Sequence, residues 1–155
     1  MMMKRSIISL AVILLSGCSA MDRADKPAPL QQVNRIAPAP LPASAANALY
    51  VFYAGGTQDL ELYLRFDCDA ADVDSWVDSA VSSNNAVFKR SLPYSSIPIA
   101  MAPKDGTRPA PSVAPISWWT PLSIVNGYYR GAMESYGLRF WVDKSRSRVY
   151  VYQND

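Results

Sequence analysis

The chain has 155 residues, of which half are hydrophobic, with 15 Lys and Arg against 13 Asp and Glu and no His. This charge balance does not favour a nucleic-acid partner, which requires a clustered basic face. The absence of His excludes Ser-His-Asp triads, Cys-His dyads and His-based zinc sites.

The first 18 residues have the pattern of an export signal. Lys4 and Arg5 precede an apolar run over 7–15, and small residues follow it up to Cys18. A positive start, a short apolar core and a small-residue exit are typical of a secretory signal peptide. The run is too short to span a bilayer, which needs about 20 apolar residues. We therefore predict a signal peptide over 1–17, cleaved between Gly17 and Cys18.

The four residues Leu15-Ser16-Gly17-Cys18 resemble the lipobox of bacterial lipoproteins. The resemblance implies that Cys18 is lipidated on its sulfur, becomes the first residue of the mature chain and is then acylated, for example with palmitate, on its amine. Ser19 in place of Asp implies the outer membrane, with the domain at its periplasmic face. The alternative is an ordinary signal peptide that contains a Cys.

Loss of the signal peptide changes the charge and shortens the chain. Lys4 and Arg5 leave with it, so that 13 basic and 13 acidic residues remain. A polybasic membrane patch is therefore not expected, and acyl chains on Cys18 would supply the anchor.

The stretch 18–46 is predicted to be a lipidated N-terminus and flexible linker. It is rich in Ala and holds five prolines, without an apolar period. Pro-rich linkers extend by about 3.1 Å per residue, so this tether would hold a domain on the order of 70 Å from the membrane. The folded periplasmic domain is then expected over 47–155, which is enough for one core.

The first half of that domain reads as two strands and a helix. Residues 49–53 are aromatic or β-branched in type, Gly55-Gly56 marks a turn, and 60–66 alternate between apolar and polar residues. Apolar residues at helical spacing predict a helix over 70–83, for which Asp69 is a favoured N-cap.

The middle of the domain is rich in proline. A further strand is expected over 86–92, and seven prolines in 93–121 then exclude a long regular element. Within this stretch Ile97–Ile99 is a candidate edge strand, and 104–107 is a candidate exposed loop tip. Because long loops without regular structure are often functional, we expect a contact surface here.

The last third has two interpretations at its start. Thr120-Pro121, with apolar residues at helical spacing up to Tyr136 and Gly137 as C-terminal cap, predicts a helix. The alternative is a strand pair across 124–143, since Gly127 and Gly131 weaken a helix.

The chain ends in a predicted hairpin of residues 138–143 and 148–152. Phe140, Val142, Val149 and Val151 would face the core, and Trp141, Tyr150 and Tyr152 the opposite side. These elements together predict an α+β fold: a small, mostly antiparallel sheet with two helices, preceded by the Pro/Ala-rich tether.

No constellation of catalytic or metal-binding residues emerges. The cluster of aspartates from Asp67 to Asp78 does not have the ligand spacing of a calcium loop. Glu61 and Glu134 are the only glutamates, and nothing places them together. We therefore predict no enzyme activity, no metal and no cofactor. Cys68, alone once Cys18 is lipidated, is expected to be buried.

Aromatic residues are the remaining signal for a partner. Tyr and Trp are enriched at protein interfaces, although about half of these rings should be core because strand neighbours point to opposite faces. By that alternation, Trp118 and Trp119 would not both be buried. The candidate interaction surface consists of Trp118, Trp119, Lys104, Arg108, Tyr150 and Tyr152.

The segment Pro121–Gln153 loosely resembles the end of the small periplasmic N-terminal domains of secretins, which also occur in lipoproteins of conjugation, secretion and pilus systems. The resemblance implies a non-catalytic accessory that binds a periplasmic or outer-membrane protein of an envelope-spanning assembly. An immunity or inhibitor lipoprotein that captures a periplasmic toxin is the alternative, and a cell-wall or glycan-binding module is a second one.

Overall fold

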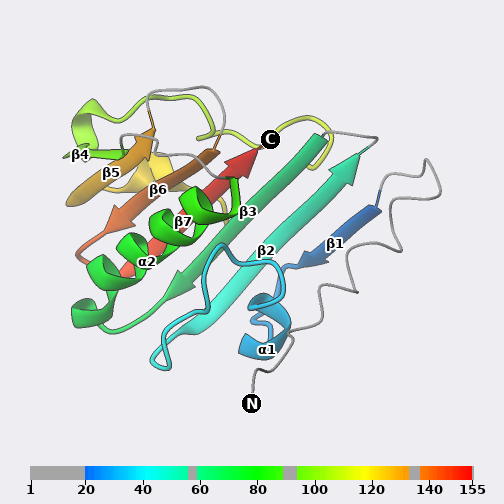
Figure 1. Cartoon of the computed structure of the whole chain (residues 1–155). Coiled ribbons are helices and arrows are strands. Elements are labelled where there is room, and N and C mark those ends of the chain that lie inside the picture. The colour runs from blue at the N-terminus through cyan, green and yellow to red at the C-terminus, as the bar shows by residue number, and fades with distance from the viewer. Residues whose placement is uncertain (1–19, 56–58, 89–93, 133–136, 155) are drawn as a thin grey trace, which may run out of the picture.

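The computed structural model describes residues 20–55, 59–88, 94–132 and 137–154. In these ranges one antiparallel sheet of seven strands has the order β1-β2-β3-β7-β6-β5-β4 (Figure 1). The strands are β1 (Ala20–Ala24), β2 (Ala46–Gly55), β3 (Asp59–Asp67), β4 (Tyr94–Pro98), β5 (Gly127–Ala132), β6 (Gly137–Asp143) and β7 (Arg148–Asn154). Two α-helices, α1 (Leu30–Val33) and α2 (Ala70–Phe88), and two short 3-10 turns, η2 (Ile99–Met101) and η3 (Pro121–Ser123), complete the described elements. The predicted α+β fold is confirmed.

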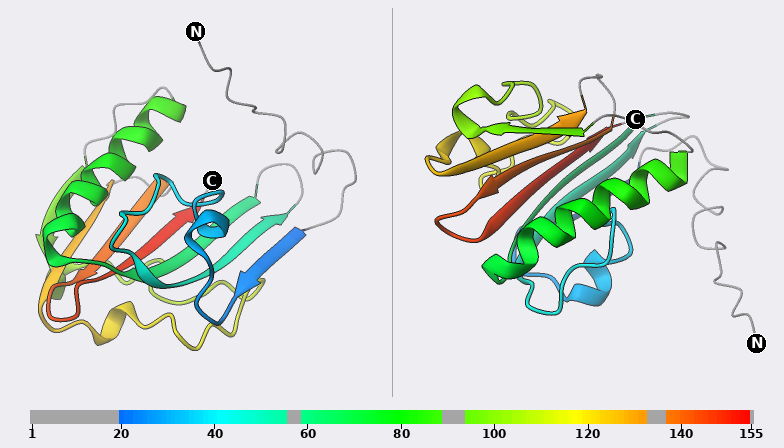
Figure 2. Two further views of the ribbon diagram at one scale, coloured as in Figure 1. Left: turned by 90° about the horizontal axis from the view of Figure 1, so that it is seen from below. Right: turned by 60° about the vertical axis from the view of Figure 1, so that its left-hand side comes forward.

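One face of the sheet, here called the helical face, packs against α2. Leu62, Leu64 and Phe66 alternate along β3 toward this face, and Trp76 of α2 lies edge-on to the Phe66 ring with centroids 4.8 Å apart. Side chains of β6 and β7 with the same alternation complete the layer, including Phe140 and Val151. Figure 2 (left) shows α1 and α2 together on this side of the strands.

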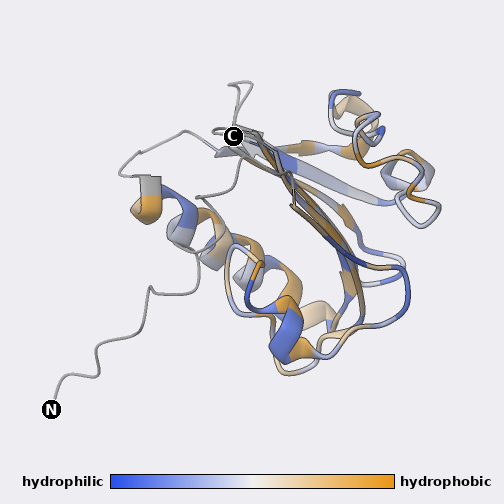
Figure 3. Ribbon diagram, turned by 90° about the vertical axis from the view of Figure 1, so that its right-hand side faces the viewer, coloured by the Kyte–Doolittle hydropathy of each residue, from blue (hydrophilic) through white to orange (hydrophobic). Residues whose placement is uncertain are grey.

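The opposite face, here called the aromatic face, is covered by chain without α-helix or strand. Residues 99–126, the covering segment, run beneath the sheet in Figure 2 (left) and on the side away from α2 in Figure 3. The segment buries Val113, Ile116 and Ile124 against strand residues of the other alternation, among them Tyr63 and Trp141. The sheet therefore has an apolar core on each side, since β-strand neighbours point to opposite faces.

Residues 20–45 correct the prediction of a flexible tether. β1 pairs with β2, Val33 is fully buried, and Ala39 and Leu41 are nearly so. The backbone carbonyl of Pro40 accepts a hydrogen bond from the Trp76 indole at 3.0 Å. The apolar side chains between the prolines pack on the helical face. The prolines are tolerated because a loop does not need the backbone N–H that proline lacks. The folded unit therefore includes Ala20.

Helix α2 is longer than the sequence predicts. It continues through Asn84 and Asn85 to Phe88, and the Asn84 amide donates a hydrogen bond to the Tyr94 hydroxyl at 3.1 Å. The polar side chain is thus satisfied inside the fold and does not end the helix. The strand expected over 86–92 is wrong for 86–88, and its remainder lies outside the described residues.

The helix expected after Thr120-Pro121 is wrong, and the alternative strand pair is correct. Among the described residues of this stretch only η3 is helical, and β5 pairs with β6. A Cβ on Gly127 would lie 1.7 Å from the Val142 carbonyl oxygen, so close strand pairing explains the glycine that weakened the helix. Gly137 opens β6 at a φ of 119° and caps no helix.

The other strand predictions are confirmed with small shifts. The hairpin β6–β7 has the predicted faces, with Phe140 and Val151 toward α2 and Trp141 and Tyr150 toward the covering segment. The edge strand β4 begins earlier than predicted and ends at Pro98, because Ile99 belongs to η2.

Candidate functional site

The four aromatic residues of the predicted interaction surface are interior. Trp118, Trp119, Tyr150 and Tyr152 are between 0 and 8% exposed. The fold does bring them together, because the Trp119 ring lies edge-on to Tyr150, with centroids 5.5 Å apart, and to Trp118 at 6.1 Å. They therefore form core between the covering segment and the sheet and no exposed surface, which corrects the prediction.

The alternation rule fails at Trp118 and Trp119 because they are not in a strand. The Trp119 backbone amide donates to the Ile116 carbonyl in a turn, at 3.1 Å. Each indole N–H then finds its own acceptor: Trp118 donates to the Asp25 carboxylate at 2.8 Å and Trp119 to the Gly106 carbonyl at 3.1 Å. Both rings are thus buried with their polar atoms satisfied.

Side chains of the sheet hold the covering segment in place. The Tyr63 hydroxyl accepts a hydrogen bond from the Ala110 amide at 3.0 Å, and burial strongly raises the pKa of Tyr63. Arg139, itself 5% exposed, forms an ion pair with Asp105 at 2.9 Å. The Thr120 and Tyr150 hydroxyls lie 3.1 Å apart. These contacts fix an irregular segment that lacks the regular backbone hydrogen bonds of an α-helix or a strand.

The exposed residues of the predicted surface lie along the covering segment. Lys104 and Arg108 are exposed, as expected. Met101, Leu122 and Val125 expose 69, 60 and 92% of their area, which sequence analysis did not single out. We call these five residues the outer loop surface. Its signal in the sequence is weak, because a long apolar residue in a loop does not show by itself which way it points.

The helical face holds a groove that sequence analysis missed. It has a volume of about 960 Å³, within the range of ligand pockets. Phe52, Leu60 and Leu62 form its floor, and Val87 and Ile36 lie on its α2 and α1 sides. Further groove residues are Ala20, Met21, Asp22, Pro29, Gln31, Gln32, Arg35, Ala37, Pro38, Ser83, Asn84 and Gln153. Part of the groove is formed by the N-terminal segment. Sequence analysis missed the groove because it predicted a flexible tether there.

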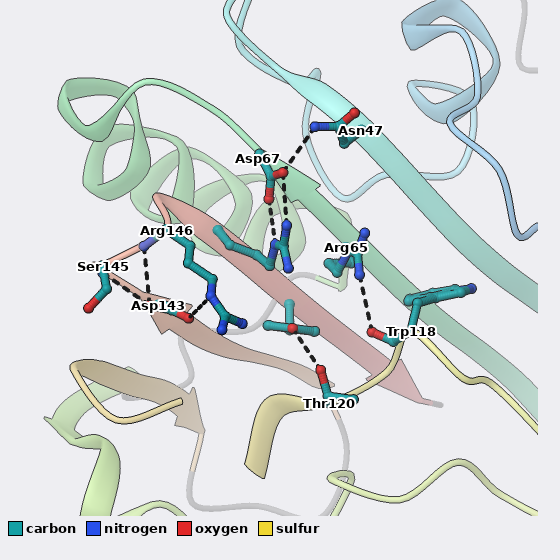
Figure 4. A network of polar contacts seen from close by, with 10 residues as sticks. Asn47, Arg65, Asp67, Trp118, Thr120, Asp143, Ser145 and Arg146 are labelled. Atoms are coloured by element: carbon teal, nitrogen blue, oxygen red, sulfur yellow. Dashed lines mark hydrogen bonds and ion pairs between the residues drawn. The ribbon is translucent and has the colours of Figure 1, made fainter. Parts of the chain in front are cut away.

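Polar side chains at one end of the sheet form a structural network (Figure 4). Asp67 accepts two hydrogen bonds from Arg148, at 2.5 and 3.0 Å, and one from Asn47. Burial alone would raise the pKa of Asp67, but these hydrogen bonds lower it below its ordinary value. Asp143 accepts backbone hydrogen bonds from Ser145 and Arg146, which fixes the β6–β7 turn.

The aspartates on and near α2 are engaged by protein groups. Asp72 accepts from Ser44, Asp74 accepts from the Tyr128 hydroxyl at 2.6 Å, and Asp78 pairs with Arg130. Within the described ranges, no three His, Cys, Asp or Glu side chains come together in a way that would hold a metal ion.

Cys68 is buried, as predicted, at 8% exposure. Burial and nearby carboxylates raise the pKa of its thiol to about 11, so that it stays protonated at neutral pH. Gly17 and Cys18, the predicted cleavage and lipidation positions, lie outside the described residues.

No family model, curated protein or solved structure matches the chain. Among the residues that the structure describes, no helix combines the length and apolar character needed to cross a membrane.

Proposed function

We propose that this chain is a lipoprotein anchored to the periplasmic face of the outer membrane, where it acts as a non-catalytic protein-interaction module. Acyl chains on Cys18 form the anchor after cleavage at Gly17. The module serves as an accessory of an envelope-spanning secretion, conjugation or pilus assembly. The observation that carries the proposal is the outer loop surface, which presents apolar and basic side chains on a firmly held segment.

The composition of this surface suits a protein partner. Single exposed apolar residues are common, but here Met101, Leu122 and Val125 lie in one segment with Lys104 and Arg108. Met and Arg are enriched where proteins meet. Because hydrogen bonds and an ion pair already fix the segment, binding would cost little ordering entropy.

Other side chains offer less support for the alternatives. A glycan-binding module would need exposed rings for stacking on sugars, but Trp119 and Tyr150 are buried in the aromatic face. Asp72, Asp74 and Asp78 have protein partners, and the Cys68 thiol is protonated and buried. The hypothesis of a protein-interaction module therefore needs the fewest assumptions.

Photo-crosslinking from the outer loop surface tests the interaction. A photoreactive residue at Val125, in the tagged full-length chain in its own envelope, is expected to capture the same envelope protein that co-purifies with the tag. The matched control is the same residue at Val87, which is 73% exposed on the other side of the sheet and should not capture it.

The captured protein decides between the candidate functions. Stoichiometric recovery of assembly components supports the accessory role. Capture of one secreted effector, and only when that effector is expressed, supports the immunity role instead. Equal capture from Val125 and Val87, or none from either, contradicts an interaction through the outer loop surface.

The anchor has a separate test. Cys18→Ser is expected to leave the chain unprocessed or to release it from the outer-membrane fraction, as followed by fractionation and by the mass of the mature N-terminus. An unchanged outer-membrane fraction with the same mass would contradict lipidation.

A further inference from the structure

The lipidation position and the fold are separated by two residue steps. Ala20 is already paired in the sheet, opposite Ala54 of β2. Two residues span at most about 7 Å, so groups attached to Cys18 start within that distance of the sheet edge. Without a tether, an anchored domain stays next to its own lipid.

The groove of the helical face opens at this same position. Ala20 is among its lining residues, and so is Asp22, which lies opposite Phe52 on the helical face. Its floor is apolar, with Leu62 only 1% exposed at the bottom, and Val87 stands 73% exposed on the opposite wall. An elongated apolar ligand that enters from Ala20 would cover Val87 and the apolar floor and remove that surface from water.

We propose that one acyl chain of the lipidated Cys18 lies in the groove between α1, α2 and the sheet, while the others remain in the bilayer. The inference rests on the lipidation put forward in the proposed function. The lipobox resemblance implies three acyl chains on Cys18. Two are enough for stable anchoring, so the third can leave the membrane without release of the protein. The groove offers that chain an apolar floor of Phe52, Leu60 and Leu62, while Asp22 and Arg35 also line it.

A second copy of the chain, paired through β1, is a less favourable occupant of the same sheet edge. In an antiparallel pair of identical strands, directly opposed residues face the same side of the sheet. The two-fold axis that relates the strands must therefore lie between one residue and its own copy in the second strand. An axis at Asp22 or at Arg23 opposes like charges, which destabilises the pair. An axis at Met21 pairs only the first three residues of β1.

A photoreactive fatty acid, metabolically incorporated, tests the proposal on the full chain. The lipidated protein is purified in dilute detergent, irradiated and digested, and the crosslinked peptides are identified by mass spectrometry. We expect crosslinks within one molecule to groove peptides that contain Ile36, Leu60 or Val87. Val87→Glu places a charge in the groove and should lower this yield about ten-fold, because burying an unpaired charge is unfavourable.

Val125→Glu is the matched control, since it makes the same change at a side chain that is 92% exposed on the other side of the sheet. The groove crosslinks should be unchanged in this variant. An equal loss in both variants would mean that the charge, and not its place, reduces the yield, and would overturn the proposal.

The readouts separate this proposal from the proposed function. If no fatty acid is found on Cys18, the anchor itself is contradicted, whatever the groove binds. If Cys18 carries the label but crosslinks only to detergent, the anchor stands and the groove proposal is overturned. In the wild-type protein, groove crosslinks from vesicles of photoreactive phosphatidylethanolamine, with none from the label on Cys18, would assign the groove to a bilayer lipid, which also overturns it.

Discussion

The two faces of the sheet are covered in different ways. On the helical face, α2 satisfies its own backbone hydrogen bonds and needs only apolar packing, as between Trp76 and Phe66. On the aromatic face, irregular chain provides the cover, and the sheet supplies hydrogen-bonding groups such as the Tyr63 hydroxyl to hold it. A rigid helix cannot follow the whole sheet, so it leaves a groove beside the N-terminal segment, whereas an irregular segment follows the aromatic rings closely.

The largest expected effect comes from the helical face. Phe66→Ala removes a fully buried ring that contacts Trp76, and should lower the free energy of unfolding by about 3–5 kcal/mol. Chemical denaturation, followed by circular dichroism, measures it. A loss below about 1 kcal/mol would contradict the view that α2 and the sheet form the main core.

Trp119→Ala tests the other face. Truncation leaves a cavity among Tyr63, Trp141 and Tyr150, and should cost about 3 kcal/mol, at the low end for a buried Trp because the segment can relax into the space. Limited proteolysis should then cut within residues 99–126 before the sheet unfolds. Cleavage elsewhere first would mean that the two faces unfold as one unit.

The Asp67–Arg148 pair tests a contribution that titrates with pH. Arg148→Ala should cost about 1–2 kcal/mol at neutral pH, as the loss of charge-assisted hydrogen bonds implies. Arg146→Ala, which removes an arginine 57% exposed in the same turn, is the control and should cost less than about 1 kcal/mol.

The direction of the pH dependence follows from the lowered pKa of Asp67. The unfolded chain takes up the proton near the ordinary value of 3.8 and the folded chain only at lower pH. The contribution of the pair is therefore present above 3.8 and lost as the pH falls through the folded pKa. Urea denaturation over this range should show the difference between wild type and Arg148→Ala shrinking with acidification. A constant difference would contradict the assignment.

The smallest effect on stability, and the sharpest on function, is expected from two exposed valines. Val87→Glu and Val125→Glu should each change the free energy of unfolding by less than about 0.5 kcal/mol. Val87→Glu should affect only the lipid crosslink, and Val125→Glu only capture of the protein partner. If both variants lose both readouts, the two faces do not have separate roles.

Sequence analysis predicts those parts of the fold in which the spacing of apolar residues is set by the local backbone geometry alone. Alternation along residues 60–66 and in the final hairpin reflects strand neighbours that point to opposite faces of the sheet, and all three strands are confirmed. The apolar positions of α2 predict its face, but not its end, because the partner of Asn84 is Tyr94 in another element.

The failures occur where tertiary contacts decide. Prolines and alanines before residue 46 have no period, yet Val33 and Leu41 are buried because the helical face would otherwise be open to water. The apolar positions from Leu122 to Tyr136 match a helix, but β5 pairs with β6 through a glycine that only close backbone contact explains. The groove depends on the burial of the stretch before residue 46. The outer loop surface depends on which side chains of the covering segment point outward. Neither could be predicted from local pattern.

The pairing of β1 with β2 also bears on aggregation. A chain shortened to residues 47–155 would lack β1 and α1, and β2 would become an edge strand with unpaired backbone groups along residues 50–54, an uncharged run that includes Tyr50, Phe52 and Tyr53. Such edges favour strand-to-strand association between molecules. We therefore expect the shortened chain to form concentration-dependent, β-rich aggregates, which the N-terminal strand prevents in the longer one.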